Sequence, residues 1–89
     1  MKSKVTKQFR KRFERLSAEV QEQARRAYNL WKENPYHGSL QFKQISQRQP
    51  IYSVRVGIGW RALGLLEEET VYWFWIGSHG DYDELIRRL

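Results

Sequence analysis

The sequence predicts an α+β fold: an N-terminal antiparallel helix hairpin packed on a small antiparallel meander sheet of about four strands, with a short C-terminal helix. Apolar residues recur at helical spacing between residues 6 and 34. Between residues 51 and 76 they occur instead in three segments rich in β-branched and aromatic residues. Short turns separate these three segments, so consecutive strands are expected to pair as hairpins.

The composition describes one small domain, which we place at residues 1–89. The chain contains no cysteine and only two histidines, His37 and His79, so we expect no disulfide, no metal site and no cofactor. No apolar run approaches the ~20 residues of a membrane span, and no signal peptide is evident. We therefore expect a cytoplasmic protein with no membrane partner.

The chain is basic, with 16 Lys and Arg residues against 10 Asp and Glu residues and a formal charge of +6. A basic excess of this size favours an acidic partner, either nucleic acid or an acidic protein segment. The alternative is that the charge belongs to a solvated helix surface.

Two helices are predicted first. Thr6 and Ser17 are suitable N-caps for them, and Pro35 ends the second because it disfavours helical geometry at the preceding residue. The apolar stripe of the first helix consists of Phe9, Phe13 and Leu16. Residues 1–5 are short and basic, and we expect them to be frayed.

The strands follow. Residues 40–45 form a candidate strand that carries Lys43, and residues 51–56, 60–66 and 70–76 form the meander. A hairpin about Gly57-Ile58-Gly59 places Arg55 directly opposite Arg61. Because like charges in that position destabilise a sheet, the pair indicates a site that holds an anion.

Symmetric pairing about each turn separates the meander into two faces. We assign to the helix-covered core the face with Tyr52, Val54, Val56, Trp60, Ala62, Gly64, Leu66, Tyr72, Phe74 and Ile76. The other face carries Ser53, Arg55, Arg61, Leu63, Leu65, Trp73 and Trp75. Its mixture of arginines and aromatic residues suits phosphates and stacked bases.

The last strand leads into Gly77-Ser78-His79-Gly80, which we expect to emerge as a loop beside the Gly57–Gly59 turn. Asp81, with Glu84 three residues later, is typical of a capping box that opens a final helix over residues 82–89. His79 and Tyr82 would then lie at the positive end of that helix, where an anion is favoured.

The chain resembles the RelE/ParE toxin superfamily of bacterial toxin–antitoxin pairs. The resemblance rests on the order of its elements: two helices, then a meander containing YSVRVGIGWRALG, then a last strand that runs into a His-containing segment. The resemblance covers nearly the whole chain. RelE-like members cut messenger RNA on the ribosome without a metal, whereas ParE-like members inhibit DNA gyrase. The resemblance implies that the chain is a toxin with a cognate antitoxin as partner. If the chain is RelE-like, its target is messenger RNA on the ribosome.

The resemblance also implies roles for individual residues. Arg61 matches the arginine after the hairpin turn that stabilises the scissile phosphate in RelE-like nucleases, and Arg55 matches a basic position before it. His79 and Tyr82 fall where relatives place acid–base side chains. The residues that we expect to contact RNA are Lys43, Ser53, Trp73 and Trp75.

We therefore expect a ribosome-dependent, metal-independent mRNA endoribonuclease that represses translation. Two alternatives stay open: a ParE-like gyrase inhibitor, and a catalytically inactive basic binding module of the same fold. Ser53 stands where some RelE-like nucleases carry a second basic residue, and Asp81 and Asp83 add negative charge to a segment that is often basic in relatives.

Overall fold

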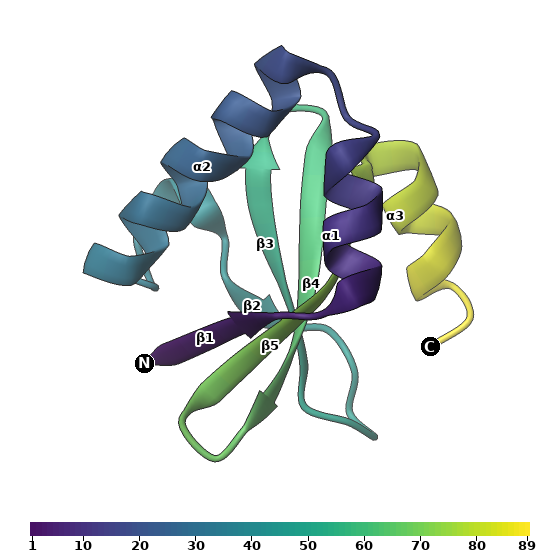
Figure 1. Ribbon diagram of the computed structural model, residues 1–89. Coiled ribbons are helices and arrows are strands. Elements are labelled where there is room, and N and C mark those ends of the chain that lie inside the picture. The colour runs from purple at the N-terminus through teal and green to yellow at the C-terminus, as the bar shows by residue number, and fades with distance from the viewer.

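A computed structural model describes all 89 residues and confirms the α+β class (Figure 1). The helices are α1 (Lys7–Glu14), α2 (Ala18–Glu33), the short 3-10 helix η1 (Gly38–Leu40) and α3 (His79–Ile86). The strands are β1 (Lys2–Val5), β2 (Lys43–Gln44), β3 (Ile51–Gly57), β4 (Trp60–Glu67) and β5 (Thr70–Ser78). They form one sheet in the order β1-β5-β4-β3-β2. None of the helices is long and apolar enough to cross a membrane.

The first strand corrects the expectation of a frayed N-terminus. Residues Lys2–Val5 pair in parallel with β5, with Lys2 opposite Thr70 and Val5 opposite Trp73. The sheet therefore has five strands and is mixed, whereas the meander alone is antiparallel. Because β1 is an exposed edge strand with three polar residues, its sequence lacks the apolar alternation by which strands are recognised.

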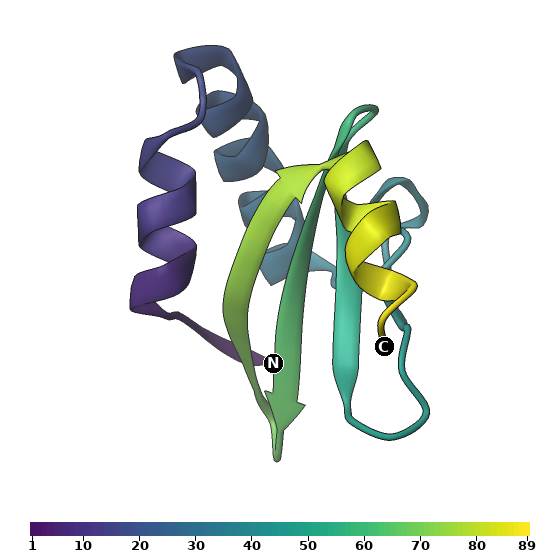
Figure 2. The ribbon, with the colours of Figure 1, turned by 90° about the vertical axis from the view of Figure 1, so that its right-hand side faces the viewer.

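The two N-terminal helices begin where the sequence predicts. The hydroxyl oxygen of Thr6 accepts a hydrogen bond from the backbone N–H of Phe9, and that of Ser17 accepts one from Val20. Both helices lie over the same face of the sheet, α1 above β5 and α2 above β3, and they diverge from their junction (Figure 1). The third helix covers the opposite face (Figure 2).

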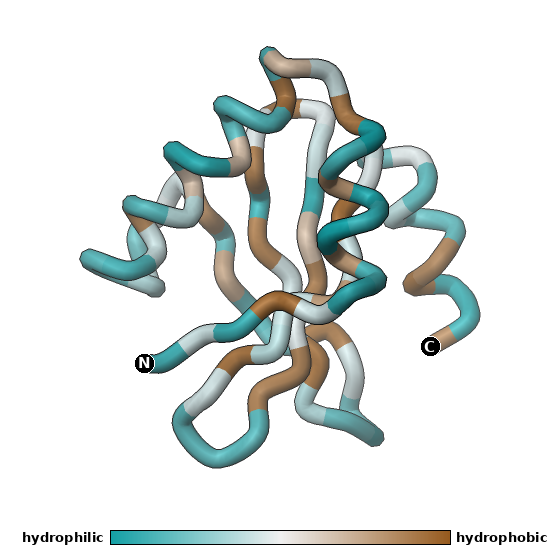
Figure 3. The backbone as a smooth tube through the Cα atoms, in the orientation of Figure 1, coloured by the Kyte–Doolittle hydropathy of each residue, from teal (hydrophilic) through white to brown (hydrophobic).

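Apolar side chains fill both faces of the sheet, and hydrophilic positions follow the outer sides of α1 and α2 (Figure 3). Under α1 and α2, the Trp31 ring meets the Phe42 and Trp73 rings edge-on, with centroids 5.8 and 5.4 Å away. Under α3, a smaller cluster contains Ile51, Leu63 and Tyr82. A helix on each face explains why β5 is apolar almost throughout.

A β-bulge changes the predicted faces of β5. Leu63 pairs with Trp75 but Gly64 pairs with Trp73, so Phe74 is an extra residue. The predicted faces of Tyr72, Trp73 and Phe74 are therefore wrong, whereas those of Trp75 and Ile76 are confirmed. Gly64 permits this register, because a Cβ atom there would lie 2.8 Å from the Trp73 ring.

Candidate functional site

The predicted arginine pair is present on the α3 side of the sheet. Arg55 lies directly opposite Arg61, next to a bulge at the end of the β3–β4 hairpin. The Nη1 atom of Arg61 donates hydrogen bonds to the carbonyl oxygens of Gly57 and Trp60, at 3.0 and 2.9 Å. Arg61 therefore holds the hairpin turn together with one nitrogen, and its remaining N–H groups make no hydrogen bond within the chain.

The electrostatics of the pair favour an anion. Burial, and then the charge of Arg55, lower the pKa of Arg61, whereas Tyr82 and Asp83 act in the opposite direction. Arg55 itself takes part in none of the four ion pairs of the chain. An anion that contacted both guanidinium groups would relieve their repulsion.

His79 lies beside this hairpin, as predicted. Ser78 pairs with Trp60, and the backbone N–H of His79 donates to the carbonyl oxygen of Gly59 at 2.8 Å. The expected loop is absent, however, because α3 begins at His79. Its N-cap is Ser78, whose hydroxyl accepts a hydrogen bond from the N–H of Asp81, so the capping box predicted at Asp81 is wrong.

This earlier helix start gives His79 a partner that the sequence analysis did not identify. The Nδ1 atom of His79 lies 3.0 Å from the Oδ2 atom of Asp83, one helical turn away. Both side chains are about half exposed. An aspartate that accepts the Nδ1 proton orients the ring and leaves Nε2 free to accept a proton. The signal was the i, i+4 spacing, which is visible only once the helix starts at His79.

Tyr82 and Ser53 are placed differently from the exposed groups expected. The Tyr82 hydroxyl donates to the Ser53 hydroxyl oxygen at 3.2 Å, beneath α3. Tyr82 is 7% exposed and Ser53 is 3% exposed. α3 therefore covers both side chains. Lys43 pairs with Ser53 and so shares its face, and its side chain is exposed.

The two tryptophans expected to contact RNA are likewise not free. Trp73 is 4% exposed in the main core, against Trp31. Trp75 is half-buried, and the guanidinium of Arg12 stacks 4.9 Å from its ring. Arg12 also donates from Nε to the carbonyl oxygen of Ile76 at 2.8 Å. Arg12 therefore supplies a hydrogen-bond donor to the edge of β5 beyond the residues that pair with β1. Helical periodicity does not reveal this role.

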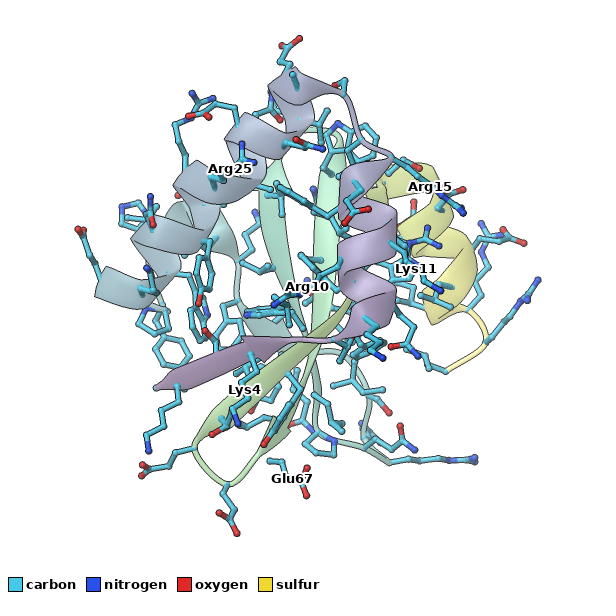
Figure 4. All side chains as sticks on the ribbon, in the orientation of Figure 1. Lys4, Arg10, Lys11, Arg15, Arg25 and Glu67 are labelled. Atoms are coloured by element: carbon cyan, nitrogen blue, oxygen red, sulfur yellow. The ribbon has the colours of Figure 1, made fainter.

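A second feature is an apolar groove between α1 and α2, with a volume of about 800 Å³. Its apolar lining comprises Val5, Phe9, Phe13, Ala24, Ala27, Tyr28, Trp31, Val54, Val56, Ala62, Trp73 and Ile76. Lys4, Arg10, Arg25 and Glu14 supply its charges, a net excess of two positive charges from three cations and one anion. Figure 4 shows Arg10 on the groove side of α1, with Lys11 and Arg15 on the other side.

Comparisons with known proteins agree with this architecture. The family model of the ParE-like toxin domain matches residues 18–84. No curated protein sequence matches the chain. The RelB–RelE antitoxin–toxin complex of Methanococcus jannaschii contains a chain of similar fold, with a TM-score of 0.72, 13% identity, and coverage of 91% of this chain and 95% of that one.

Two bacterial toxins have the same fold. The isolated RelE toxin of E. coli gives a TM-score of 0.65 at 18% identity, over 98% of this chain and 96% of that chain. The YoeB/ParE toxin of Agrobacterium tumefaciens gives 0.66 at 17% identity, over 89% of this chain and 99% of that chain.

Proposed function

Since the chain belongs to the family of ParE-like toxin domains and is a toxin of the RelE/ParE type, we propose that it is a metal-independent endoribonuclease that cleaves messenger RNA on the ribosome. The observation that carries this proposal is the His79–Asp83 pair at the end of β5, beside two arginines that face each other. An imidazole with an oriented base nitrogen can activate the 2′-hydroxyl, and two cations can stabilise the charge that develops at phosphorus in phosphodiester cleavage.

The chemistry follows from these positions. Nε2 of His79 accepts the proton of a ribose 2′-hydroxyl while Asp83 holds Nδ1. The 2′-oxygen forms a bond to phosphorus, and the bond from phosphorus to the 5′-oxygen breaks. Arg55 and the free N–H groups of Arg61 stabilise the charge of the pentacoordinate phosphorane. Because the Tyr82 hydroxyl is engaged by Ser53, we assign the proton for the 5′-oxygen to solvent water.

The test is induced expression of the protein alone in bacteria, with pulse incorporation of labelled methionine and thymidine. Wild-type protein should stop methionine incorporation promptly, and cleaved transcripts should be detectable by primer extension. His79→Ala should abolish both effects, whereas His37→Ala, in the loop before η1, should abolish neither. Equal toxicity of the two variants would show that His79 is not the base.

The second candidate is a ParE-like gyrase inhibitor, which is favoured by the description of the matching family. It requires no acid–base residue, so His79→Ala would remain toxic, and thymidine incorporation would fall before methionine incorporation. Unchanged growth on expression of wild-type protein would instead support the inactive binding module.

For the partner, we propose that an antitoxin inserts an acidic amphipathic helix into the groove between α1 and α2. The groove offers apolar floor and walls with an excess of positive charge at its rim, which complements such a helix. Arg25→Glu reverses one rim charge and should weaken neutralisation by the antitoxin co-expressed with the toxin. Lys11 lies on the other side of α1 and does not line the groove, so Lys11→Glu is the control. Equal neutralisation of both variants would exclude the groove.

A further inference from the structure

A second cleft lies on the other side of α2 and has a lining largely different from that of the groove. It has a volume of about 590 Å³, within the range of small-molecule sites. Three segments form it: α2, η1 and the β3–β4 hairpin. Its lining residues are Gln23, Arg26, Ala27, Leu30, Ser39, Leu40, Arg55, Val56, Gly57, Ile58, Gly59 and Trp60.

The chemistry of the cleft combines cations with an aromatic ring. Arg26 and Arg55 are its only ionisable lining residues, and no acidic residue lines it. Arg26 has a single carboxylate nearby, that of Glu22, at 3.9 Å and on the exposed side of α2. Trp60 and the two leucines supply apolar surface. A phosphate beside an aromatic or apolar base is the ligand that such a lining accommodates.

Arg55 connects this cleft with the proposed site of cleavage. It lines the cleft and also lies opposite Arg61 in the sheet. β2 pairs only with Tyr52 and Ser53, so no strand pairs with this edge of β3 at Arg55. A single-stranded RNA that leaves the arginine pair can therefore cross this edge of the sheet into the cleft without passing over another β-strand.

We propose that the cleft binds a nucleotide that flanks the scissile phosphodiester in single-stranded RNA. Arg55 stays with the scissile phosphate, the phosphate of the flanking nucleotide contacts Arg26, and the base of that nucleotide packs against Trp60. This inference rests on the proposed function, because it assigns the course of the RNA substrate beyond His79 and Arg61. Arg55 is the one residue that the cleft shares with the proposed site of cleavage, and the rest of the cleft adds affinity for the substrate without taking part in the reaction.

The chain offers a matched pair of variants. Arg25 and Arg26 are neighbours on α2, both lie near Glu22, and their side chains are 59% and 67% exposed. Only Arg26 lines the cleft, and only Arg25 lines the groove. Arg25→Ala and Arg26→Ala therefore remove the same charge from the same helix at different sites.

The experiment measures fluorescence anisotropy of a labelled oligoribonucleotide of about nine nucleotides, with 2′-O-methyl groups that prevent cleavage. Arg26→Ala should raise the Kd about tenfold, as expected for one charged hydrogen bond, and lower the slope of log K against log salt by about 0.7. Arg25→Ala should raise the Kd less than about twofold, since an exposed charge away from the RNA contributes little.

Two results would contradict RNA binding in the cleft. One is an equal rise of the Kd in both variants, and the other is no measurable binding of the oligoribonucleotide by wild-type protein. Failure of the proposed function is read separately, from the incorporation of labelled methionine after wild-type expression. Protein that stops translation but shows equal RNA affinity in both variants retains the proposed function and loses only this inference.

Discussion

The buried position of Tyr82 leads to a prediction that distinguishes a structural role of its hydroxyl from a catalytic one. Its hydroxyl donates to Ser53 beneath α3, and both residues are buried. In the superfamily that the chain resembles, the matching segment carries acid–base side chains, whereas the structure gives this hydroxyl a partner in the core. Tyr82→Phe removes only the hydroxyl, so it should lower stability and leave toxicity intact.

The magnitude follows from the contact. One net hydrogen bond is worth about 1 kcal/mol, and the Ser53 hydroxyl left behind in a buried position adds a cost of similar size. We expect Tyr82→Phe to lower the free energy of unfolding by about 1–2 kcal/mol, and the Tm by about 4–8 °C for each kcal/mol. Adding Ser53→Ala removes the unsatisfied partner, so the double variant should be more stable than the sum of the two single changes predicts.

Urea denaturation of the wild-type protein, both single variants and the double variant measures the coupling. Growth arrest and transcript cleavage after induction measure the activity of the same four proteins. Full toxicity with reduced stability is the expected result for Tyr82→Phe. Loss of cleavage with unchanged stability would refute the reasoning, because it would mean that Tyr82 leaves Ser53 and transfers a proton.

Three further predictions concern the fold around the site. Gly64→Ala places a methyl group against the Trp73 ring and should destabilise the protein by about 1–3 kcal/mol in urea denaturation, whereas Gly59→Ala, with open space around its Cβ, should cost less. Arg12→Ala removes the hydrogen bond to Ile76 and the cation–π contact with Trp75, so it should lower the free energy of unfolding by about 1–2 kcal/mol in thermal unfolding. Equal stability of Arg12→Ala and Arg15→Ala would contradict this role. Ser78→Ala should cost about 1 kcal/mol and increase amide exchange in the first turn of α3, and unchanged exchange would contradict the assigned cap.

Much of the fold depends on neighbours in the chain, and these parts were predictable. The caps at Thr6 and Ser17 need only a hydroxyl before an amphipathic segment, and both were predicted correctly. Arg55 faces Arg61 as predicted, although by a different route: the turn contains only Ile58 and Gly59, and a bulge between Arg55 and Gly57 brings the two arginines opposite each other. These features are local, so composition and spacing are sufficient to find them.

The rest of the candidate site depends on contacts between distant segments. The bulge at Phe74 places Trp73 in the core, where its ring packs over Gly64 and against Trp31. Symmetric pairing about the turn cannot anticipate such an extra residue.

The sequence by itself determined the α+β class, the two N-terminal helices and the facing arginines. Only the tertiary structure decided that β1 pairs with β5, that α3 begins at His79 and joins it to Asp83, and that Tyr82 is buried on Ser53. The physical reason is that the pairing of an edge strand and the docking of a helix on a sheet depend on groups far away in the chain, and that the end of β5, after which α3 begins, is set by pairing with β4. Their own residues carry too weak a local preference to reveal them.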